Sequence, residues 1–236
     1  GAWIGGDKKD DTMLLVPYVK NRQMIGGNIN YRLLKEGRSD LNCETMLEDI
    51  HEAMKKIVEV CNEKGYTLKK LILKGNSAGG HLVLMYAYKY QHISPVEVAV
   101  VYSNCGPTDM TDKNYYGDLS VFSDEQMLTL QGLLISEKLD HDNYRSEEVL
   151  EKLWKVSPCC YAKKDSPATI FHSCGKDMLV PVSNGDKLNE VLKSLGVDSY
   201  YDIFDNSQHC CRDKKDNQKV KMFDKMEDEM IKKYTT

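Results

Sequence analysis

The sequence predicts an α/β fold with a mostly parallel central sheet flanked by helices. Strand-like and helix-like patterns alternate along the chain, which is typical of parallel sheets whose strands are connected by helices. A serine flanked by glycines lies between one such strand and the helix after it. With 236 residues, the chain is long enough for one sizeable domain and too short for two. We therefore expect residues 1–236 to form a single domain.

Five short segments predict the strands of the sheet. They are runs rich in apolar and aromatic residues, such as "VEVAVVYSN" and "ATIFHSCG", and most have the continuous apolar character of strands that are buried on both faces. In chain order, the five segments are 23–33, 71–73, 96–104, 168–175 and 198–205.

Apolar residues at spacings of three and four predict the helices. The longest pattern covers 43–65, where Met46, Leu47, Ile50 and Met54 share one helical face. This helix is expected to end at a glycine, which commonly stops helices. Three further helices are expected over 79–91, 186–196 and 217–234.

Residues 111–157 interrupt this alternation. They carry two helical patterns, "SDEQMLTLQGLLISEKL" and "SEEVLEKLWKV", and no strand pattern. In open α/β sheets, ligands bind outside the carboxyl ends of the strands. We therefore expect 111–157 to form a small helical cap or insertion over that end of the sheet.

Charge and hydropathy exclude several classes of partner. The chain has 32 basic and 36 acidic residues, so its net charge of −4 does not favour binding to nucleic acid or to an anionic membrane surface. Its longest apolar runs are far shorter than the ~20 residues that a membrane-spanning helix needs.

The eight cysteines show no C-x-x-C zinc spacing, and a chain of this size does not need disulfides. Reduced thiols favour a cytoplasmic location.

The stretch "LKGNSAGGHL" places Ser77 on a sharp strand-to-helix turn. The residues match G-x-S-x-G, the nucleophile elbow, in which the serine hydroxyl is lifted off the sheet above the start of a helix. The glycines at 75, 79 and 80 suit such a turn, because a β-carbon would obstruct the close backbone approaches. Ser77 is therefore the candidate nucleophile.

A serine nucleophile needs a base to accept its proton, and the base is usually a histidine. Of six histidines, His209 follows the last predicted strand in a loop, from which its side chain can reach the end of the sheet. His141 falls in the expected cap, and His172 lies within a strand. His81 follows Ser77 by four residues on the helix and is expected to point away from the hydroxyl. These positions make His209 the candidate base.

The acid that orients the base is expected just past a strand end. Asp177 directly follows the strand 168–175, which puts it at the same end of the sheet as His209. Asp109, after the preceding strand, is the reserve candidate, and Asp205 is a further carboxylate close to the base.

Six segments in series match one known group of enzymes: "GAWIGGDK", "NINYRL", "GNSAGGHL", "SP", "HSCGKDMLVPV" and "FDNSQH". With these segments the chain resembles the α/β-hydrolase esterases and lipases related to hormone-sensitive lipase and the bacterial carboxylesterases. The resemblance implies an α/β-hydrolase fold with a catalytic triad of Ser77, Asp177 and His209.

The resemblance also implies an oxyanion hole at the start of the chain. The group has the motif H-G-G-[GA]-W, whose glycine amides bind the oxyanion together with the amide after the nucleophile. Carried over, the donors are the amides of Gly1, Ala2 and Ala78. This motif is incomplete here, because its histidine and first glycine are absent from a chain that begins at Gly1. We therefore expect the N-terminal strands of the fold to be missing from this chain.

The function that the resemblance implies is two-step acyl transfer on a small-molecule ester, with small or short-chain acyl groups. No metal ion and no organic cofactor are expected to take part. Three alternatives stay open. The start of the chain also resembles amidases of the arylformamidase type, the domain resembles peptidases of the prolyl oligopeptidase group, and the fold could belong to a binding protein whose catalysis has lapsed.

Overall fold

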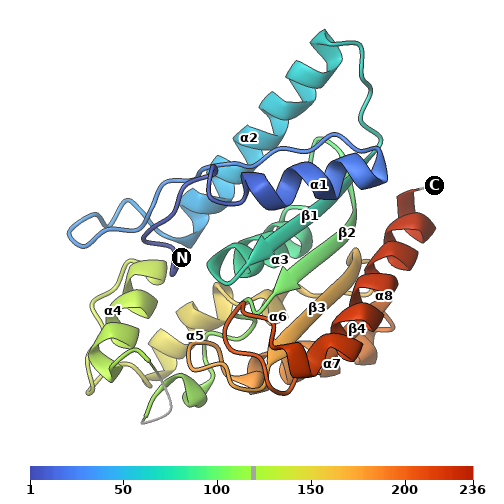
Figure 1. The fold of residues 1–236 in the computed structure, drawn as a ribbon. Helices are drawn as coiled ribbons and strands as arrows, with labels where there is room; N and C mark the ends of the chain where they lie inside the picture. The colour runs from blue at the N-terminus through green and yellow to red at the C-terminus, as the bar shows by residue number, and fades with distance from the viewer. Residues whose placement is uncertain (118–120, 236) are drawn as a thin grey trace.

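A four-stranded parallel sheet forms the centre of the computed structural model, which describes residues 1–117 and 121–235 (Figure 1). The strands pair in chain order, and each neighbouring pair is parallel. Their carboxyl ends therefore lie at one edge of the sheet. The strands are β1 (Lys70–Asn76), β2 (Glu97–Asn104), β3 (Ala168–Cys174) and β4 (Ser199–Phe204).

Helices connect the strands and cover both faces of the sheet (Figure 1). Helix α3 contacts β1 and β2, α7 contacts β3 and β4, and α8 contacts β2, β3 and β4. The longer helices are α1 (Thr12–Arg22), α2 (Cys43–Glu63), α3 (Ala78–Lys89), α4 (Asp124–Ile135), α5 (Glu147–Lys155), α7 (Val182–Leu195) and α8 (Asn217–Thr235). Three short segments, α6 (Pro158–Tyr161) and the 3-10 turns η1 (Lys113–Tyr115) and η2 (Lys214–Asp216), complete the set.

Across the described residues, no helix combines the length and the apolar character needed to cross a lipid bilayer.

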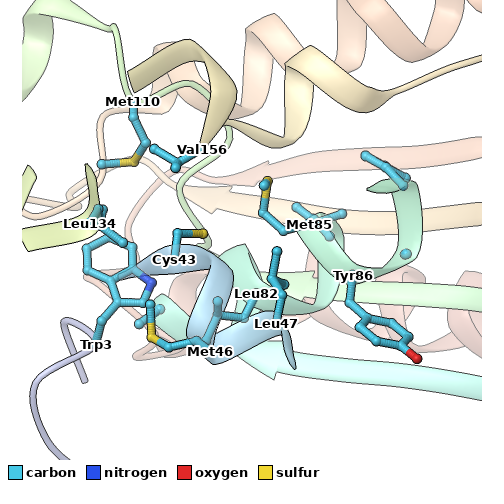
Figure 2. Packing of buried hydrophobic residues seen from close by; sticks show 14 of the residues in the cluster. Trp3, Cys43, Met46, Leu47, Leu82, Met85, Tyr86, Met110, Leu134 and Val156 are labelled. Carbon is cyan, nitrogen blue, oxygen red and sulfur yellow. The ribbon is translucent and has the colours of Figure 1, made fainter. Parts of the chain in front are cut away.

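Two hydrophobic clusters hold the helices to the sheet. Successive side chains of a strand point to opposite faces. On β2, Val101 therefore joins the cluster with α2 and α3, whereas Val100 and Tyr102 join the cluster with α8. Figure 2 shows part of the first cluster, in which Trp3 and Leu134 of α4 are both buried. The beginning of the chain is thus anchored in the same core as α4.

Most predicted elements are confirmed. Strands occupy the four expected segments from β1 onward, and helices occupy all four expected positions. Within 111–157, α4 and α5 coincide with the two helical patterns, and no strand occurs in its described part. Figure 1 shows both helices on the side toward which the strand arrows point. Residues 118–120 of the expected cap lie outside the described residues.

The prediction of a strand over 23–33 is wrong. This segment has irregular backbone, and none of the described strands pairs with it. Backbone amides in and next to this segment form other hydrogen bonds. The Arg32 amide donates to Asp49 of α2 at 2.7 Å, and the Leu34 amide donates to the Trp3 carbonyl at 3.0 Å. A strand needs ladder hydrogen bonds to a neighbour. The apolar and aromatic pattern alone could not supply them.

Helix α1 was not expected from the sequence. It contains Pro17 and buries none of its own residues, so it lacks a clear apolar face. Two contacts hold it to α8: the Tyr18 hydroxyl donates to Glu227 Oε1 at 2.8 Å, and Arg22 pairs with Asp228 at 2.5 Å. Polar contacts between distant segments explain why the periodicity did not reveal this helix.

The packing at the end of β1 generates a stability prediction. A β-carbon on Gly75 would lie 2.2 Å from the Gly79 carbonyl oxygen, so backbone would have to move. We expect Gly75→Ala to lower the free energy of unfolding by about 1–3 kcal/mol or more, measured by denaturant unfolding. Gly79→Ala is the matched control, because a β-carbon there meets no atom within 4 Å. Equal losses in both variants would contradict the prediction.

Candidate active site

The turn between β1 and α3 carries Ser77 in an unusual backbone conformation. Its φ is 51° and its ψ is −122°, a region that non-glycine residues rarely adopt. Two backbone hydrogen bonds hold the turn: the Ser77 amide donates to the Asn104 carbonyl at 2.8 Å, and the His81 amide donates to the Ser77 carbonyl at 3.0 Å. The turn has the geometry expected of a nucleophile elbow.

His209 links this turn to the acid. It lies in the loop after β4, with Nε2 2.8 Å from the Ser77 hydroxyl oxygen and Nδ1 2.6 Å from Asp177 Oδ2. Donation from Nδ1–H to the carboxylate leaves Nε2 to accept the hydroxyl proton. The structure thus brings together the three residues that the sequence indicated, from the carboxyl ends of β1, β3 and β4.

The Asp177 carboxylate is held on both sides. Oδ1 accepts hydrogen bonds from the amides of Leu179 and Val180, at 2.8 and 2.9 Å, which leaves Oδ2 for His209. The Asp177 side chain is 1% exposed, so water does not compete for these contacts. A buried carboxylate whose other oxygen is held by two backbone amides fixes both the tautomer and the orientation of the imidazole.

Two opposing influences act on the pKa of His209. Burial by itself lowers it, because a buried imidazole loses the hydration of its charged form. The hydrogen bond to Asp177, followed by the neighbouring Cys210 thiol, raises it, and the resulting pKa is about 10. The site therefore stabilises the imidazolium that forms when the histidine accepts a proton.

The alternative carboxylates lie elsewhere. Asp109 Oδ1 accepts hydrogen bonds from the amide and the hydroxyl of Thr111, at 2.9 and 2.6 Å. Asp205 pairs with Lys219 at 2.7 Å in an exposed position. Neither carboxylate contacts His209 in the described structure, so the geometry favours Asp177 over both.

The His81 side chain contacts the beginning of the chain and not the Ser77 hydroxyl. Its ring is fully buried; Nδ1 accepts a hydrogen bond from Trp3 Nε1 at 3.1 Å, and Nε2 donates to the Val156 carbonyl at 2.8 Å. Burial lowers the pKa of His81 to about 4, so the ring is neutral. This histidine ties Trp3 to α3 one turn after Ser77, a positioning contact that the sequence did not indicate.

The amides expected to form the oxyanion hole lie close to these contacts. Ala78 is the first residue of α3, and Ala2 precedes the anchored Trp3. Within residues 1–117 and 121–235, neither the Ala2 nor the Ala78 amide donates to any acceptor. The Gly1 amine instead donates to the Gly5 carbonyl at 2.5 Å. Ala2 and Ala78 are thus available as donors, whereas Gly1 is engaged.

Two groups of cysteine and histidine side chains lie beside the triad. The first contains Cys105, His172 and Cys174, and the second contains Cys105, His209 and Cys210; within each group the possible ligand atoms lie within 4.8 Å of one another. The sequence spacing did not indicate either group, because folding brings its members together from separate strands.

Comparison with known proteins agrees with this architecture. The BD-FAE family model matches residues 1–192. Among curated proteins, none matches the chain. Similar solved structures include a truncated carbohydrate esterase from gut microbiota, with a TM-score of 0.72 and 16% identity, over 100% of this chain and 84% of that one.

Two further structures share the fold. Thermogutta terrifontis esterase 2, phosphonylated by sarin, has a TM-score of 0.71 and 18% identity over 98% of this chain and 80% of its own. An acetyl ester-xyloside bifunctional hydrolase from Caldicellulosiruptor lactoaceticus has a TM-score of 0.69 and 17% identity over 99% and 79%. These likenesses confirm the predicted α/β-hydrolase fold. Because the family model matches well over half of its residues, the chain belongs to the BD-FAE family of α/β-hydrolases.

Proposed function

We propose that this chain is a serine esterase that cleaves small or short-chain acyl esters, with Ser77 as its nucleophile. The observation that carries the proposal is the continuous hydrogen-bond chain from Asp177 through His209 to Ser77, with distances of 2.6 and 2.8 Å. The buried acid, the oriented base and the lifted hydroxyl are the parts that acyl transfer requires.

The first half of the reaction acylates the serine. His209 Nε2 accepts the Ser77 proton as the hydroxyl oxygen attacks the ester carbonyl, and Asp177 stabilises the resulting imidazolium. The negative charge on the carbonyl oxygen is stabilised by the amides of Ala78 and Ala2. Each oxyanion donor of this kind lowers the activation barrier by about 3–4 kcal/mol. The tetrahedral intermediate then collapses, and His209 gives its proton to the leaving alcohol.

The second half regenerates the enzyme. Water takes the place of the alcohol, His209 accepts a proton from it, and the hydroxide attacks the acyl-enzyme carbonyl. Collapse of this second intermediate releases the acid, and the proton returns from His209 to Ser77. Every proton transfer in the cycle uses the one nitrogen that faces the serine, so the reaction depends on the ring orientation that Asp177 sets.

Two exposed apolar side chains lie next to Asp177. Met178 follows Asp177 directly, and the Val121 amide from the segment 111–157 donates to the Met178 carbonyl at 2.8 Å. Both side chains are exposed, by 62% for Val121 and 51% for Met178. They offer apolar surface next to Asp177. The carbohydrate esterase and the acetyl ester-xyloside hydrolase among the similar structures make acetylated carbohydrates the first natural esters to test.

The central experiment compares the wild-type chain with Ser77→Ala. We expect p-nitrophenyl acetate to be hydrolysed by the wild type, and kcat to fall by about 10⁴-fold or more in the variant, because the hydroxyl that His209 Nε2 contacts is removed. Butyryl and longer esters are expected to react more slowly than acetyl esters. N-formylkynurenine serves as the competing substrate. Faster turnover of this amide than of any ester would favour the amidase alternative, and full activity of Ser77→Ala would exclude the proposal.

The role of the acid is tested by Asp177→Asn. The amide can no longer accept the Nδ1 proton as a carboxylate does, so the imidazole adopts the wrong tautomer and its charged form loses a partner. We expect kcat to fall by about 10³- to 10⁴-fold with little change in KM. Asp109→Asn is the matched control and is expected to keep wild-type kcat. A large loss in the control with none in Asp177→Asn would reverse the assignment of the acid.

The pH profile tests the electrostatics of the base. Only the neutral imidazole accepts a proton, and the pKa of His209 is raised to about 10, so kcat/KM is expected to keep rising as the pH increases above neutrality. Cys210→Ser removes one of the groups that raise this pKa, so the rise should move to lower pH.

Cys211→Ser is the control for this profile, because the Cys211 side chain is exposed and is not among the groups that shift the pKa of His209. A profile that levels off near the ordinary histidine pKa of 6.5, and is the same in wild type and Cys210→Ser, would contradict the prediction.

A further inference from the structure

Three potential metal ligands meet at the end of the sheet beside the triad. Cys105 follows β2 directly, and His209 and Cys210 lie in the loop after β4. The two sulfur atoms and a ring nitrogen of His209 lie within 4.8 Å of one another. Neither cysteine forms a disulfide, so both sulfur atoms can act as metal ligands.

This ligand set matches the chemistry of soft divalent cations. Two thiolates and an imidazole are typical ligands of zinc and unfavourable ligands of magnesium or calcium. Zinc–sulfur and zinc–nitrogen bond lengths place tetrahedral ligand atoms about 3.5–3.8 Å apart. Ligand atoms that already lie within 4.8 Å reach that spacing by modest side-chain movement. We propose that Cys105, His209 and Cys210 bind a thiophilic divalent cation such as Zn²⁺, and that the bound ion inhibits the enzyme.

A second, inner group competes for the shared thiol. Cys105 Sγ lies 3.1 Å from Cys174 Sγ and 3.8 Å from His172 Nδ1. These three side chains are at most 3% exposed, and the His172 ring is stacked on Phe204 with the ring centres 4.2 Å apart. An ion would have no open approach to these buried atoms.

The outer group is accessible by contrast. Cys210 is partly exposed, and 16% of the His209 side chain is accessible. The Cys210 thiol donates a weak hydrogen bond, 3.9 Å long, to the Asn104 carbonyl. An ion can therefore reach Cys210 and His209 first, and Cys105 then closes the site from the sheet side.

Metal binding and catalysis exclude each other at His209. One ring nitrogen of His209 bonds to Asp177 and the other to Ser77. A nitrogen that binds the ion therefore loses its hydrogen bond to one of these two residues. Each thiol releases its proton to solvent as its sulfur binds the cation. The inhibition rests on the esterase activity proposed above, whereas binding of the ion does not.

Binding is measured on the full chain with Cd²⁺, whose thiolate complexes absorb in the ultraviolet. We expect one equivalent of Cd²⁺ to produce the sulfur-to-metal charge-transfer band in wild type and equally in Ser77→Ala. Cys210→Ser should weaken binding by more than about 100-fold, because loss of even an outer partner of a metal ligand costs about 10- to 100-fold. Cys211→Ser is the matched control and should bind as wild type does.

Inhibition is measured separately with Zn²⁺ and p-nitrophenyl acetate. We expect Zn²⁺ to inhibit the wild type, a chelator to restore activity, and Mg²⁺ at the same concentration to have no effect. Relative to its own uninhibited rate, Cys210→Ser should be far less sensitive to Zn²⁺ than Cys211→Ser.

Three results would overturn the proposal. Cd²⁺ binding that is lost in Cys174→Ser and kept in Cys210→Ser would place the ion at the inner group. Equal losses in Cys210→Ser and Cys211→Ser would indicate chelation by the two adjacent surface thiols. Absence of the charge-transfer band in folded wild type and Ser77→Ala would exclude a thiolate site. If Cys105→Ser fails to fold, the variants at 210, 211 and 174 still decide the outcome.

Discussion

The strained turn at Ser77 is the constraint on which the rest of the site depends. A positive φ at a residue with a side chain costs about 1–3 kcal/mol and persists only where the surrounding structure enforces it. Here the strand supplies a glycine whose missing β-carbon lets the chain double back, and the Asn104 carbonyl on β2 accepts the Ser77 amide. The same turn starts α3, so the hydroxyl and the first free amide of that helix come from consecutive residues.

Parallel strands bring the remaining groups to that turn. Each strand of the sheet ends at the same edge, and each delivers one chemical group just beyond its last residue. The chain leads from β1 into Ser77, from β3 to Asp177 and from β4 into the loop that holds His209, while Cys105 follows β2 directly. Cys210 follows His209 directly, and its thiol raises the pKa of His209 together with the Asp177 carboxylate. The reactivity of one histidine therefore depends on a carboxylate on one side and on sulfur on the other.

The sequence predicted the parts of the fold that local pattern determines. Apolar runs and helical spacing located β1 to β4, and the order of motifs selected Ser77, Asp177 and His209, because each follows a strand. The sequence pattern did not predict the structure correctly where a segment depends on residues far away in the sequence. The segment 23–33 has the composition of a strand, but none of the described strands pairs with it. The Trp3–His81 contact and the cysteine groups join residues far apart in the sequence, so no spacing rule could reveal them.

Covalent labelling by a fluorophosphonate tests the central claim most directly, because the reagent reacts far faster with a serine that a neighbouring base has activated than with an ordinary hydroxyl. After labelling of the folded chain, digestion and mass spectrometry locate the adduct. The account predicts a single phosphonyl group on the peptide that contains Ser77, and slow labelling of the same peptide in Asp177→Asn. No adduct on a folded chain, or an adduct on another residue with Ser77 unmodified, would contradict it.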